Sequence, residues 1–489
     1  MFKKPHIWGF LLRKSMQNSF LIIVILLIFQ IGISSSSWEG SRDETVSLLK
    51  EYIDINTSNP PGDVRKAVWW IGKLLDKHSI DYQTFTVEED PMRMHLLAEI
   101  KGYNNNLKPL LLLNHMDVVP ADKQAWRVDP FKASVVDSVI YGRGSLDMKG
   151  MGIMQLMTLI QLKKEGWKPE RTVKVLCVAD EEVLGEYGAK WMIENHWDLL
   201  DPEWVWDEGG IGSKDSFPGV EVFAVAVAQK KSLWVDVIVK SISGHGSRPF
   251  DGHSNQVLAN ALSKIVSWKT PIDINVATNE MFKRVGFKIK GLNGFILRNI
   301  NNPLLKYFFG SKVAKSSVSV NAMLRNTVSL TIMDSGYKVN VIPEIAKASL
   351  DIRLLPSQDS EEFINQLKVV INDSRVQIVP KRVPEQGYIS SWESTFFSIL
   401  SEEINHLYRQ SVVTPFMSPG GTDSQYFQSK ANFCKMTENF DFSLLGNIDG
   451  IGQTQIKSLK KFFSDQINKN VVKKLVSQMN IADSKQSNE

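Results

Sequence analysis

The sequence predicts an α/β protein in which helices cover a largely parallel sheet and a smaller α+β domain is inserted. Strand-like and helix-like segments alternate over the first half of the chain. Near residue 229 the pattern changes to strands that alternate apolar and polar residues, which is typical of a sheet with one exposed face. The chain has 489 residues, more than one hydrophobic core usually serves, so two domains are expected.

Helical spacing of apolar residues marks the first elements of the larger domain. Residues 43–56 and 64–79 carry apolar side chains three and four positions apart, and residues 150–164 repeat the pattern. A loop rich in Asn and Pro separates the first two helices at 56–62. Short apolar runs predict strands at 81–87, 95–101, 109–114 and 172–179.

The insert is expected to begin with a half-exposed strand at 233–239 and a helix at 253–267. Two further strands are expected, at 326–332 and 346–354. Residues 277–322 form helical stretches rich in Lys, Phe and Leu, which we interpret as a lid added to the insert.

After residue 357 the α/β pattern resumes and ends in a helix at 456–479. The expected organisation is a signal segment at 1–36, the larger domain at 37–228 and 346–480, an inserted lid or dimerisation domain at 229–345, and a disordered tail at 481–489.

Charge separates the first residues from the rest of the chain. The formal net charge is +4, and residues 1–36 contain four basic residues and no acidic one. The rest of the chain therefore has equal numbers of basic and acidic residues, so no nucleic-acid-binding surface is expected. The two cysteines, Cys177 and Cys434, are too few for a disulfide-built scaffold, although one disulfide between them stays open.

An apolar run from Phe20 to Ile33 follows these basic residues and precedes four serines, an arrangement typical of an export signal. The run has 14 residues, whereas a bilayer-spanning helix needs about 20. A cleaved signal is therefore favoured over an uncleaved anchor. In either case the folded part is expected outside the cytoplasm, in a periplasmic, secreted or lumenal location, and membrane contact is expected only if the segment stays uncleaved.

The predicted strand 109–114 leads directly into His115 and Asp117. Side chains two apart on a strand point the same way, so these two should emerge together at the strand end, where open α/β sheets place their sites. A carboxylate beside an imidazole fixes its tautomer and raises its basicity, as a metal-binding histidine requires. His-x-Asp alone is a weak signal, and a purely structural role stays open.

Acidic residues follow at three further places. Asp147 lies in a Gly-rich turn before a helix, and Glu181 with Glu182, and then Asp207, each follow an apolar strand. Taken singly, each acid is most simply a helix cap or a solvated turn residue. Together with His115 they form a ligand set suited to zinc or a similar divalent ion. Such a site would support hydrolysis, with Glu181 as the general base.

Longer motifs surround these residues: N-H-M-D-V-V-P, W-R-V-D-P-F, G-R-G-S-L-D-M-K-G, D-E-E, D-E-G-G, S-G-H-G-S-R-P, N-V-I-P and S-P-G-G-T-D-S. With them the chain, from about residue 44 to about 475, resembles the zinc metallopeptidases that include aminoacylase, carboxypeptidase S, acetylornithine deacetylase and succinyl-diaminopimelate desuccinylase. The D-E-G-G spacing and the long 277–322 insert most resemble the branch of carboxypeptidase S and the secreted N-acyl-amino-acid hydrolase/synthases. The resemblance implies a zinc-exopeptidase-like α/β/α sandwich with an inserted α+β lid or dimerisation domain.

The resemblance also implies a site for two zinc ions. His115 and Asp207 are expected to bind one ion, Asp147 to bridge both, and Glu182 to bind the second. The family's last ligand is a C-terminal histidine, and this chain has no histidine after His406. Asp449 stands in its place, so three readings stay open: an oxygen ligand for zinc, a weak or harder-ion second site, or a loss of turnover.

Catalytic and substrate-binding roles follow from the same resemblance. Asp117 would orient His115, Glu181 would activate the attacking water, and His245 would stabilise the oxyanion across a dimer or a closed cleft. The expected substrate-binding residues are Asn340, Arg353, Gly420, Gly421 and Thr422. The apolar residues of the lid either form a pocket for an acyl chain or pack as the lid's own core.

The expected function is that of an exported metal-dependent amidohydrolase or peptidase. Its substrates would be N-acyl amino acids or small peptides with a free carboxylate, and a homodimer through the inserted domain is the expected assembly. The alternative is a catalytically impaired relative that binds peptides or acyl amino acids without turnover.

Overall fold

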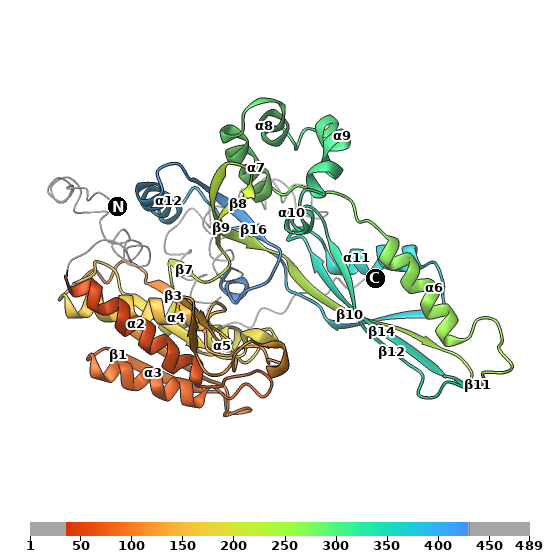
Figure 1. Cartoon of the computed structure of the whole chain (residues 1–489), viewed down its shortest axis with the longest axis horizontal. Coiled ribbons are helices and arrows are strands. Elements are labelled where there is room, and N and C mark those ends of the chain that lie inside the picture. Colours follow the sequence, from red (N-terminus) through yellow and green to blue (C-terminus); the bar gives the residue numbers. More distant parts are fainter. Residues whose placement is uncertain (1–35, 429, 431–489) are drawn as a thin grey trace, which may run out of the picture. The chain divides into compact units, whose positions relative to one another are not determined.

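The computed structural model of the protein describes residues 36–428 and residue 430 (Figure 1). The helices and strands given below belong to one compact unit that ends at Gln425. The described part of this unit contains three larger sheets, each packed on a hydrophobic core. The α/β class predicted from the sequence is confirmed.

The first sheet has the strand order β1-β2-β6-β3-β7. Its strands are β1 (Asp81–Thr86), β2 (Met94–Ile100), β3 (Leu110–His115), β6 (Val173–Val178) and β7 (Trp204–Trp206). β3 runs parallel to β6 and β7, whereas β1 and β2 join antiparallel. The sheet is therefore mixed rather than largely parallel. The seven residues between β1 and β2 are too few for the crossover that a parallel pair requires.

Four helices belong to this part of the fold: α2 (Ser36–Asp54), α3 (Arg65–Lys77), α4 (Lys149–Lys164) and α5 (Ala189–Leu200). α3 packs on β1 and β2 and buries Val68, Ile71 and Leu75, at the spacing predicted from the sequence. α4 packs against β3 and β6 and lies beside α2. The turn that carries Asp147 thereby reaches the end of β3, where His115 lies.

The second sheet has the order β16-β9-β8, with β8 (Ile211–Phe217), β9 (Val220–Gln229) and β16 (Val412–Ser418). β16 pairs parallel with β9, so the chain returns here after the insert. α12 (Thr395–Leu407) contacts β16. Four helices fill residues 276–323: α7 (Val276–Lys288), α8 (Gly291–Arg298), α9 (Pro303–Ala314) and α10 (Val318–Met323).

These four helices do not lie where the sequence analysis placed them. α7 packs on β16 and β9, and Met281, Phe282 and Val285 share a core with strand residues of the second sheet. The prediction of a lid on the inserted sheet is therefore wrong in its placement. The apolar spacing showed that these segments are helical, but it contains no information about which of two half-covered sheets they cover.

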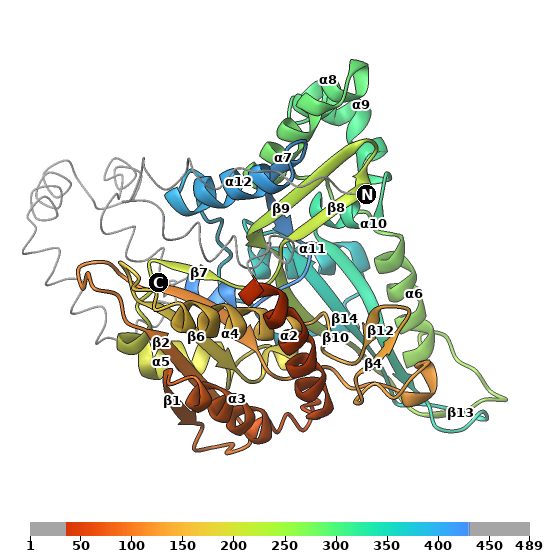
Figure 2. The ribbon, with the colours of Figure 1, turned by 60° about the vertical axis from the view of Figure 1, so that its left-hand side comes forward.

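The third sheet is antiparallel throughout, with the order β12-β14-β10-β15. Figure 2 labels three of its strands, β10, β12 and β14. Its strands are β10 (Lys231–Lys240), β12 (Thr327–Ser335), β14 (Ile345–Leu354) and β15 (Val376–Arg382), and α6 (Ser254–Ser267) and α11 (Ser360–Ile371) share its core. The sheet extends beyond residue 345, where the sequence analysis ended the insert. Because β15 pairs with β10, residues 346–382 belong with this sheet.

Smaller elements complete the description: η2 (Lys123–Ala125), η3 (Glu181–Val183), a ribbon of β4 (Ser134–Val136) and β5 (Val139–Tyr141), and a ribbon of β11 (Gly244–His245) and β13 (Val341–Ile342). Among residues 36–428 and residue 430, no helix has the length and hydropathy to cross a membrane. The predicted signal segment, Cys434, Asp449, the helix at 456–479 and the tail at 481–489 lie outside the described residues.

Candidate metal centre

His115 is the last residue of β3 and is buried. Its Nδ1 lies 2.9 Å from the backbone oxygen of Asp117, so this nitrogen carries the proton and Nε2 is left for a ligand. Burial opposes the charged form, but hydrogen bonds with Asp117 and Asp147 outweigh it and raise the pKa of His115 well above its usual value. The direction of the ring is thus fixed by its own strand end, and a cation bound at Nε2 would replace the proton there.

Carboxylates surround Nε2 of His115. The nearest oxygens belong to Asp147 at 3.1 Å, Glu208 at 3.8 Å and Glu181 at 4.0 Å. Two overlapping groups have ligand atoms within 4.8 Å of one another: His115 with Asp147 and Glu182, and His115 with Glu181 and Glu208. The structure therefore brings together His115, Asp147, Glu181 and Glu182, as the sequence predicted, and adds Glu208.

The acids of this cluster repel one another in the absence of a cation. Burial, followed by neighbouring charges, raises the pKa of Glu181 to about 8 and that of Glu208 to about 9. Burial also raises the pKa values of Glu182 and Asp207. Oδ2 of the buried Asp423 has no hydrogen-bond partner within the described residues. One imidazole and several clustered carboxyl groups fit a divalent cation such as zinc, which would replace their protons.

Glu208 takes the position that the sequence analysis gave to Asp207. The carboxylate of Asp207 accepts a hydrogen bond from the Ser424 backbone N–H at 2.9 Å. Glu208 instead points toward His115. β7 ends at Trp206, and successive side chains of extended chain point in opposite directions, so only one of two adjacent acids can face the histidine. The strand-end argument could not tell which.

Asp117 supports the cluster through hydrogen bonds. Its carboxylate accepts hydrogen bonds from the backbone N–H groups of Glu181 and Glu182, each at 3.2 Å, and from Nδ2 of Asn59 at 2.8 Å. Asp117 is fully buried, and its bond to His115 contributes to lowering its pKa against the effect of burial. It therefore stays ionised and fixes the histidine and the Glu181–Glu182 turn together.

Asn59 connects Asp117 to a buried ion pair that the sequence analysis missed. Arg93 donates to Oδ1 of Asn59 at 3.3 Å, and its Nε donates to Asp180 at 2.9 Å. Asp180 also accepts from the Tyr187 backbone N–H at 3.1 Å. The only available signal was Asn59 in its Asn- and Pro-rich loop; Arg93 lies in an unremarkable turn between β1 and β2.

Lys149 fixes the other side of the cluster. It is almost completely buried, and its ammonium group donates to the backbone oxygens of Tyr52 at 3.0 Å and Ile55 at 2.6 Å. Burial lowers its pKa to about 7. Because Lys149 begins α4 two residues after Asp147, it ties the Asp147 turn to the end of α2.

The structure does not bring His245 to the cluster. His245 is exposed on the β11–β13 ribbon, where its Nδ1 lies 2.8 Å from the Ser247 hydroxyl. The ribbon follows the far end of β10, whose ten residues span about 30 Å of extended chain. Asn340 lies beside His245 on this ribbon, since its carbonyl accepts from the Gly246 N–H at 2.8 Å.

The remaining predicted substrate residues lie closer to the second sheet. The Arg353 guanidinium pairs with Asp351 at 2.8 Å, on β14 near the start of β10. Thr422 is buried, and its N–H and its hydroxyl donate to the side-chain oxygen of Gln229 at 2.7 and 3.0 Å. Gly420 and Gly421 precede it after β16. Thr422 lies two residues before Ser424, whose N–H donates to Asp207, whereas Arg353 is linked to the cluster only through neighbouring strands.

Zinc should stabilise the protein more strongly as the pH rises from 6 to 8. In the metal-free protein Glu181 and Glu208 keep protons to about pH 8 and 9, whereas in the unfolded chain they lose them near pH 4.5. Their contribution to stability is therefore fully present below pH 4.5 and is lost as the pH rises through 8 and 9. A bound cation replaces those protons.

The measurement is the melting temperature at pH 6, 7 and 8, with EDTA and with excess zinc. The zinc-dependent increase should grow over this interval, and Glu208→Gln should flatten the trend. An increase that is the same at every pH would contradict the proton-holding role of these two carboxyls.

Sequence comparisons connect this chain to known proteins. Residues 111–453 match the family described as Peptidase family M20/M25/M40. The chain is 32% identical over 343 residues to the N-fatty-acyl-amino acid synthase/hydrolase PM20D1 of Xenopus tropicalis, a match covering 69% of this chain and 66% of that protein. It is 32% identical over 400 residues to the probable carboxypeptidase S-like 2 of Dictyostelium discoideum, covering 77% of this chain and 75% of that protein. The chain thus spans slightly less than two thirds of the frog relative.

Solved structures share the fold at lower identity. The M20 family metallo-carboxypeptidase Sso-CP2 from Sulfolobus solfataricus superposes with a TM-score of 0.61 at 21% identity, over 80% of this chain and 89% of that one. The dipeptidase Dug1p from Saccharomyces cerevisiae gives a TM-score of 0.59 at 16% identity, over 85% of this chain and 90% of that one. These likenesses support the α/β architecture.

Proposed function

This chain belongs to peptidase family M20/M25/M40, and from that premise we propose that it is a metal-dependent amidohydrolase acting on N-acyl amino acids or small peptides with a free carboxylate. The observation that carries the proposal is the gathering of His115 and four carboxylates, with ligand atoms within 4.8 Å in each of two overlapping groups. Such groups are what a hydrolytic metal site requires.

The candidate ligand residues can be assigned to two zinc ions. His115 and Glu208 would hold one ion, Glu182 would hold the other, and Asp147, the most exposed acid and the nearest to Nε2, would serve both. Asp449 remains our candidate for the further ligand of the second ion, in place of the family histidine. A divalent cation at this site supplies positive charge that polarises the scissile carbonyl and acidifies the attacking water.

Glu181 would act as the general base and acid of the hydrolysis. It lies in the 3₁₀ turn η3 directly after β6, and its side chain is mostly buried beside His115 and Asp207. Asp117 fixes its backbone N–H, so the carboxylate has a defined direction. It would accept a proton from the attacking water and return that proton to the leaving amine.

The substrate class follows from the relatives and from the remaining residues. One relative is named as an N-fatty-acyl-amino acid synthase/hydrolase and another as carboxypeptidase S-like. Arg353 offers a planar donor pair for a substrate carboxylate, although it must share that group with Asp351. Thr422, with Gly420 and Gly421, would line the cleft beside Asp207.

His245 and Asn340 lie together far along the third sheet, so we propose that they serve the site of a second copy in a homodimer. The proposed organisation also includes a signal segment at residues 1–36 and an insert that begins at residue 229. We further propose that the protein is exported from the cytoplasm. Export rests on the apolar run from Phe20 to Ile33, and the N-terminal sequence of the secreted protein would test it.

A second candidate function is binding without turnover. It is favoured by one observation, the aspartate at position 449 where the family has a histidine. A protein of this kind would keep the cleft and recognise acyl amino acids or peptides, but it would not cleave them.

Hydrolysis of a panel of N-acyl amino acids and dipeptides, with zinc, manganese or cobalt added, decides between the two. We expect turnover with at least one metal and about two ions per chain by elemental analysis. One ion per chain would indicate an altered second site. Binding without turnover under every metal would support the second candidate, and a protein that takes up no metal would refute both the site and the hydrolase.

A further inference from the structure

Helices α7, α8 and α9 expose a set of large apolar side chains that the proposed hydrolase does not use. Their buried residues, such as Phe282, Ile296 and Ala314, share a hydrophobic core with strand residues of the second sheet. Their outer faces are apolar as well. We call the following residues the α8–α9 surface: Phe287, Leu292, Phe295, Leu304, Tyr307 and Phe308, each at least 49% exposed.

The spacing of these residues places them together on each helix. Leu304, Tyr307 and Phe308 are three and four positions apart on α9, so they lie on one face of that helix, and they are 69%, 81% and 68% exposed. Leu292 and Phe295 stand in the same relation on α8. A helix with apolar residues on its outer as well as its inner face is typical of a segment that contacts a second apolar phase.

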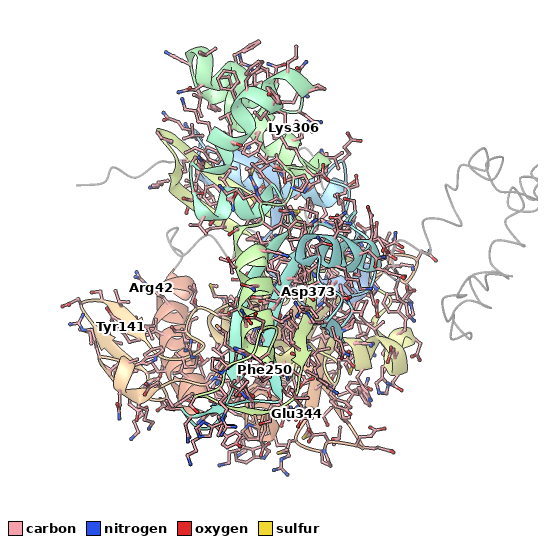
Figure 3. The ribbon with its side chains drawn as sticks, turned by 90° about the vertical axis from the view of Figure 1, so that its right-hand side faces the viewer. Arg42, Tyr141, Phe250, Lys306, Glu344 and Asp373 are labelled. Atoms are coloured by element: carbon pink, nitrogen blue, oxygen red, sulfur yellow. The ribbon has the colours of Figure 1, made fainter. Side chains whose placement is uncertain are left out.

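Positive charge is concentrated on the same helices. Residues 276–323 contain eight Lys or Arg residues and one acid, Glu280, whose carboxylate pairs with Arg284 at 2.8 Å. The whole chain has a net charge of +4, so this segment of net charge +7 is set within a remainder that is slightly acidic. Figure 3 labels one of these residues, Lys306, among the side chains of the helices.

The basic residues lie close to the exposed apolar ones in sequence and on the helices. Lys288 and Lys290 follow Phe287, Lys306 precedes Tyr307, and Lys312 and Lys315 lie on the last turn of α9 and at its end. Long Lys side chains beside aromatic and aliphatic groups can bury their stems in an interface while the ammonium groups reach anionic headgroups.

From this combination we propose that the α8–α9 surface docks on a lipid bilayer containing anionic phospholipids. The apolar side chains would enter the boundary between headgroups and acyl chains, and the lysines would pair with headgroup phosphates and carboxylates. A second copy of the chain fits less well, because a two-fold contact would place the same basic surface against itself. The proposal is independent of catalysis.

The experiment uses the full chain with an environment-sensitive fluorophore (NBD) on a single cysteine. Ser311 is exposed on α9, four residues after Tyr307. Ser311→Cys is labelled in a Cys434→Ser background, where the buried Cys177, whose pKa burial raises to about 12, does not react. The matched control is Val369→Cys on α11, which is 77% exposed and lies over the third sheet. The probe position matters because residues 20–33 could bind vesicles by themselves.

With vesicles of phosphatidylcholine and phosphatidylserine, the Ser311 probe should shift to shorter wavelength, brighten several-fold, and be quenched by spin-labelled lipid. Pure phosphatidylcholine should produce much less change, and the Val369 probe should not respond. Replacing Leu304, Tyr307 and Phe308 by Ser, or Lys306, Lys312 and Lys315 by Glu, should weaken the response by about tenfold or more. Circular dichroism checks that the substituted proteins keep their fold.

Three outcomes would overturn the proposal. The Ser311 probe could stay in a water-like environment while the protein sediments with vesicles, which would show that another segment binds lipid. It could already be shielded without vesicles, which would show that part of this chain covers the surface. It could also become shielded with rising protein concentration alone, which would identify the surface as an interface between copies.

Discussion

Replacing Glu181 by Gln is expected to lower kcat for amide hydrolysis by about 10³-fold and to leave the metal content unchanged. Gln has the same shape and the same hydrogen-bonding reach, but it cannot accept a proton from the attacking water. Because the Glu181 backbone N–H still donates to Asp117, the turn should keep its conformation. The measurement is kcat and KM on the best substrate of the panel, with zinc per chain by elemental analysis.

The matched control is Glu186→Gln, five residues along the same connection. Glu186 is exposed and pairs with Lys190 at 3.7 Å, so its substitution should leave kcat unchanged. Activity of Glu181→Gln equal to that of the parent would refute the role as base. Loss of an ion together with activity would instead make Glu181 a metal ligand, in line with its place in one of the two ligand groups.

Replacing Arg93 by Met should produce the largest loss of stability, about 3–5 kcal/mol in the free energy of unfolding. Arg93 and Asp180 are buried, with side chains 10% and 3% exposed, so the substitution leaves a carboxylate without its counter-ion. Burial already raises the pKa of Asp180, and removing the guanidinium removes one of the interactions that oppose this rise.

The same substitution should weaken zinc binding by about 10–100-fold, because Arg93 orients Asn59, which orients Asp117 and so His115. The measurements are urea unfolding in EDTA and competition for zinc against a chelator. Arg65→Met is the matched control: Arg65 also pairs with an aspartate, Asp63 at 2.7 Å, but in solvent, so no measurable change is expected.

A double variant distinguishes a lost ion pair from a lost packing contact. Adding Asp180→Asn to Arg93→Met removes the unpaired charge, so it should recover part of the stability. If Arg93→Met is as stable as the parent, or if zinc binding survives unchanged, the proposed connection from Arg93 to the metal centre is wrong.

Local sequence patterns were sufficient for the parts of this protein that depend on neighbours in the chain. The apolar run ending at His115 is a buried strand, and the helices predicted at 64–79 and 150–164 are observed as α3 and α4. Four of the site residues lie close together because each ends or follows a strand of the first sheet or precedes a helix that packs on that sheet. These residues are His115, Asp147, Glu181 and Glu182. Such positions can be identified from periodicity alone.

Contacts between residues far apart in the sequence decided which side chains face the site, and sequence periodicity does not predict such contacts. Glu208 rather than Asp207 faces His115 because Asp207 is held by the backbone N–H of Ser424, 217 positions away in the sequence. Arg93 reaches Asp180 across 87 positions, and no local pattern marks either residue as a partner.

The placement of whole elements was decided in the same way. Helices α7–α10 cover the second sheet and not the third, and β15 extends the third sheet to Arg382. By itself the sequence determined the secondary structure around the site, which follows from side-chain alternation, and its motifs indicated the family. The tertiary structure alone decided which of two adjacent acids faces the histidine, what supports Asp117, and which apolar face stays exposed. The physical reason is that a hydrogen bond or a packed face depends on distance in space, whereas periodicity records only distance along the chain.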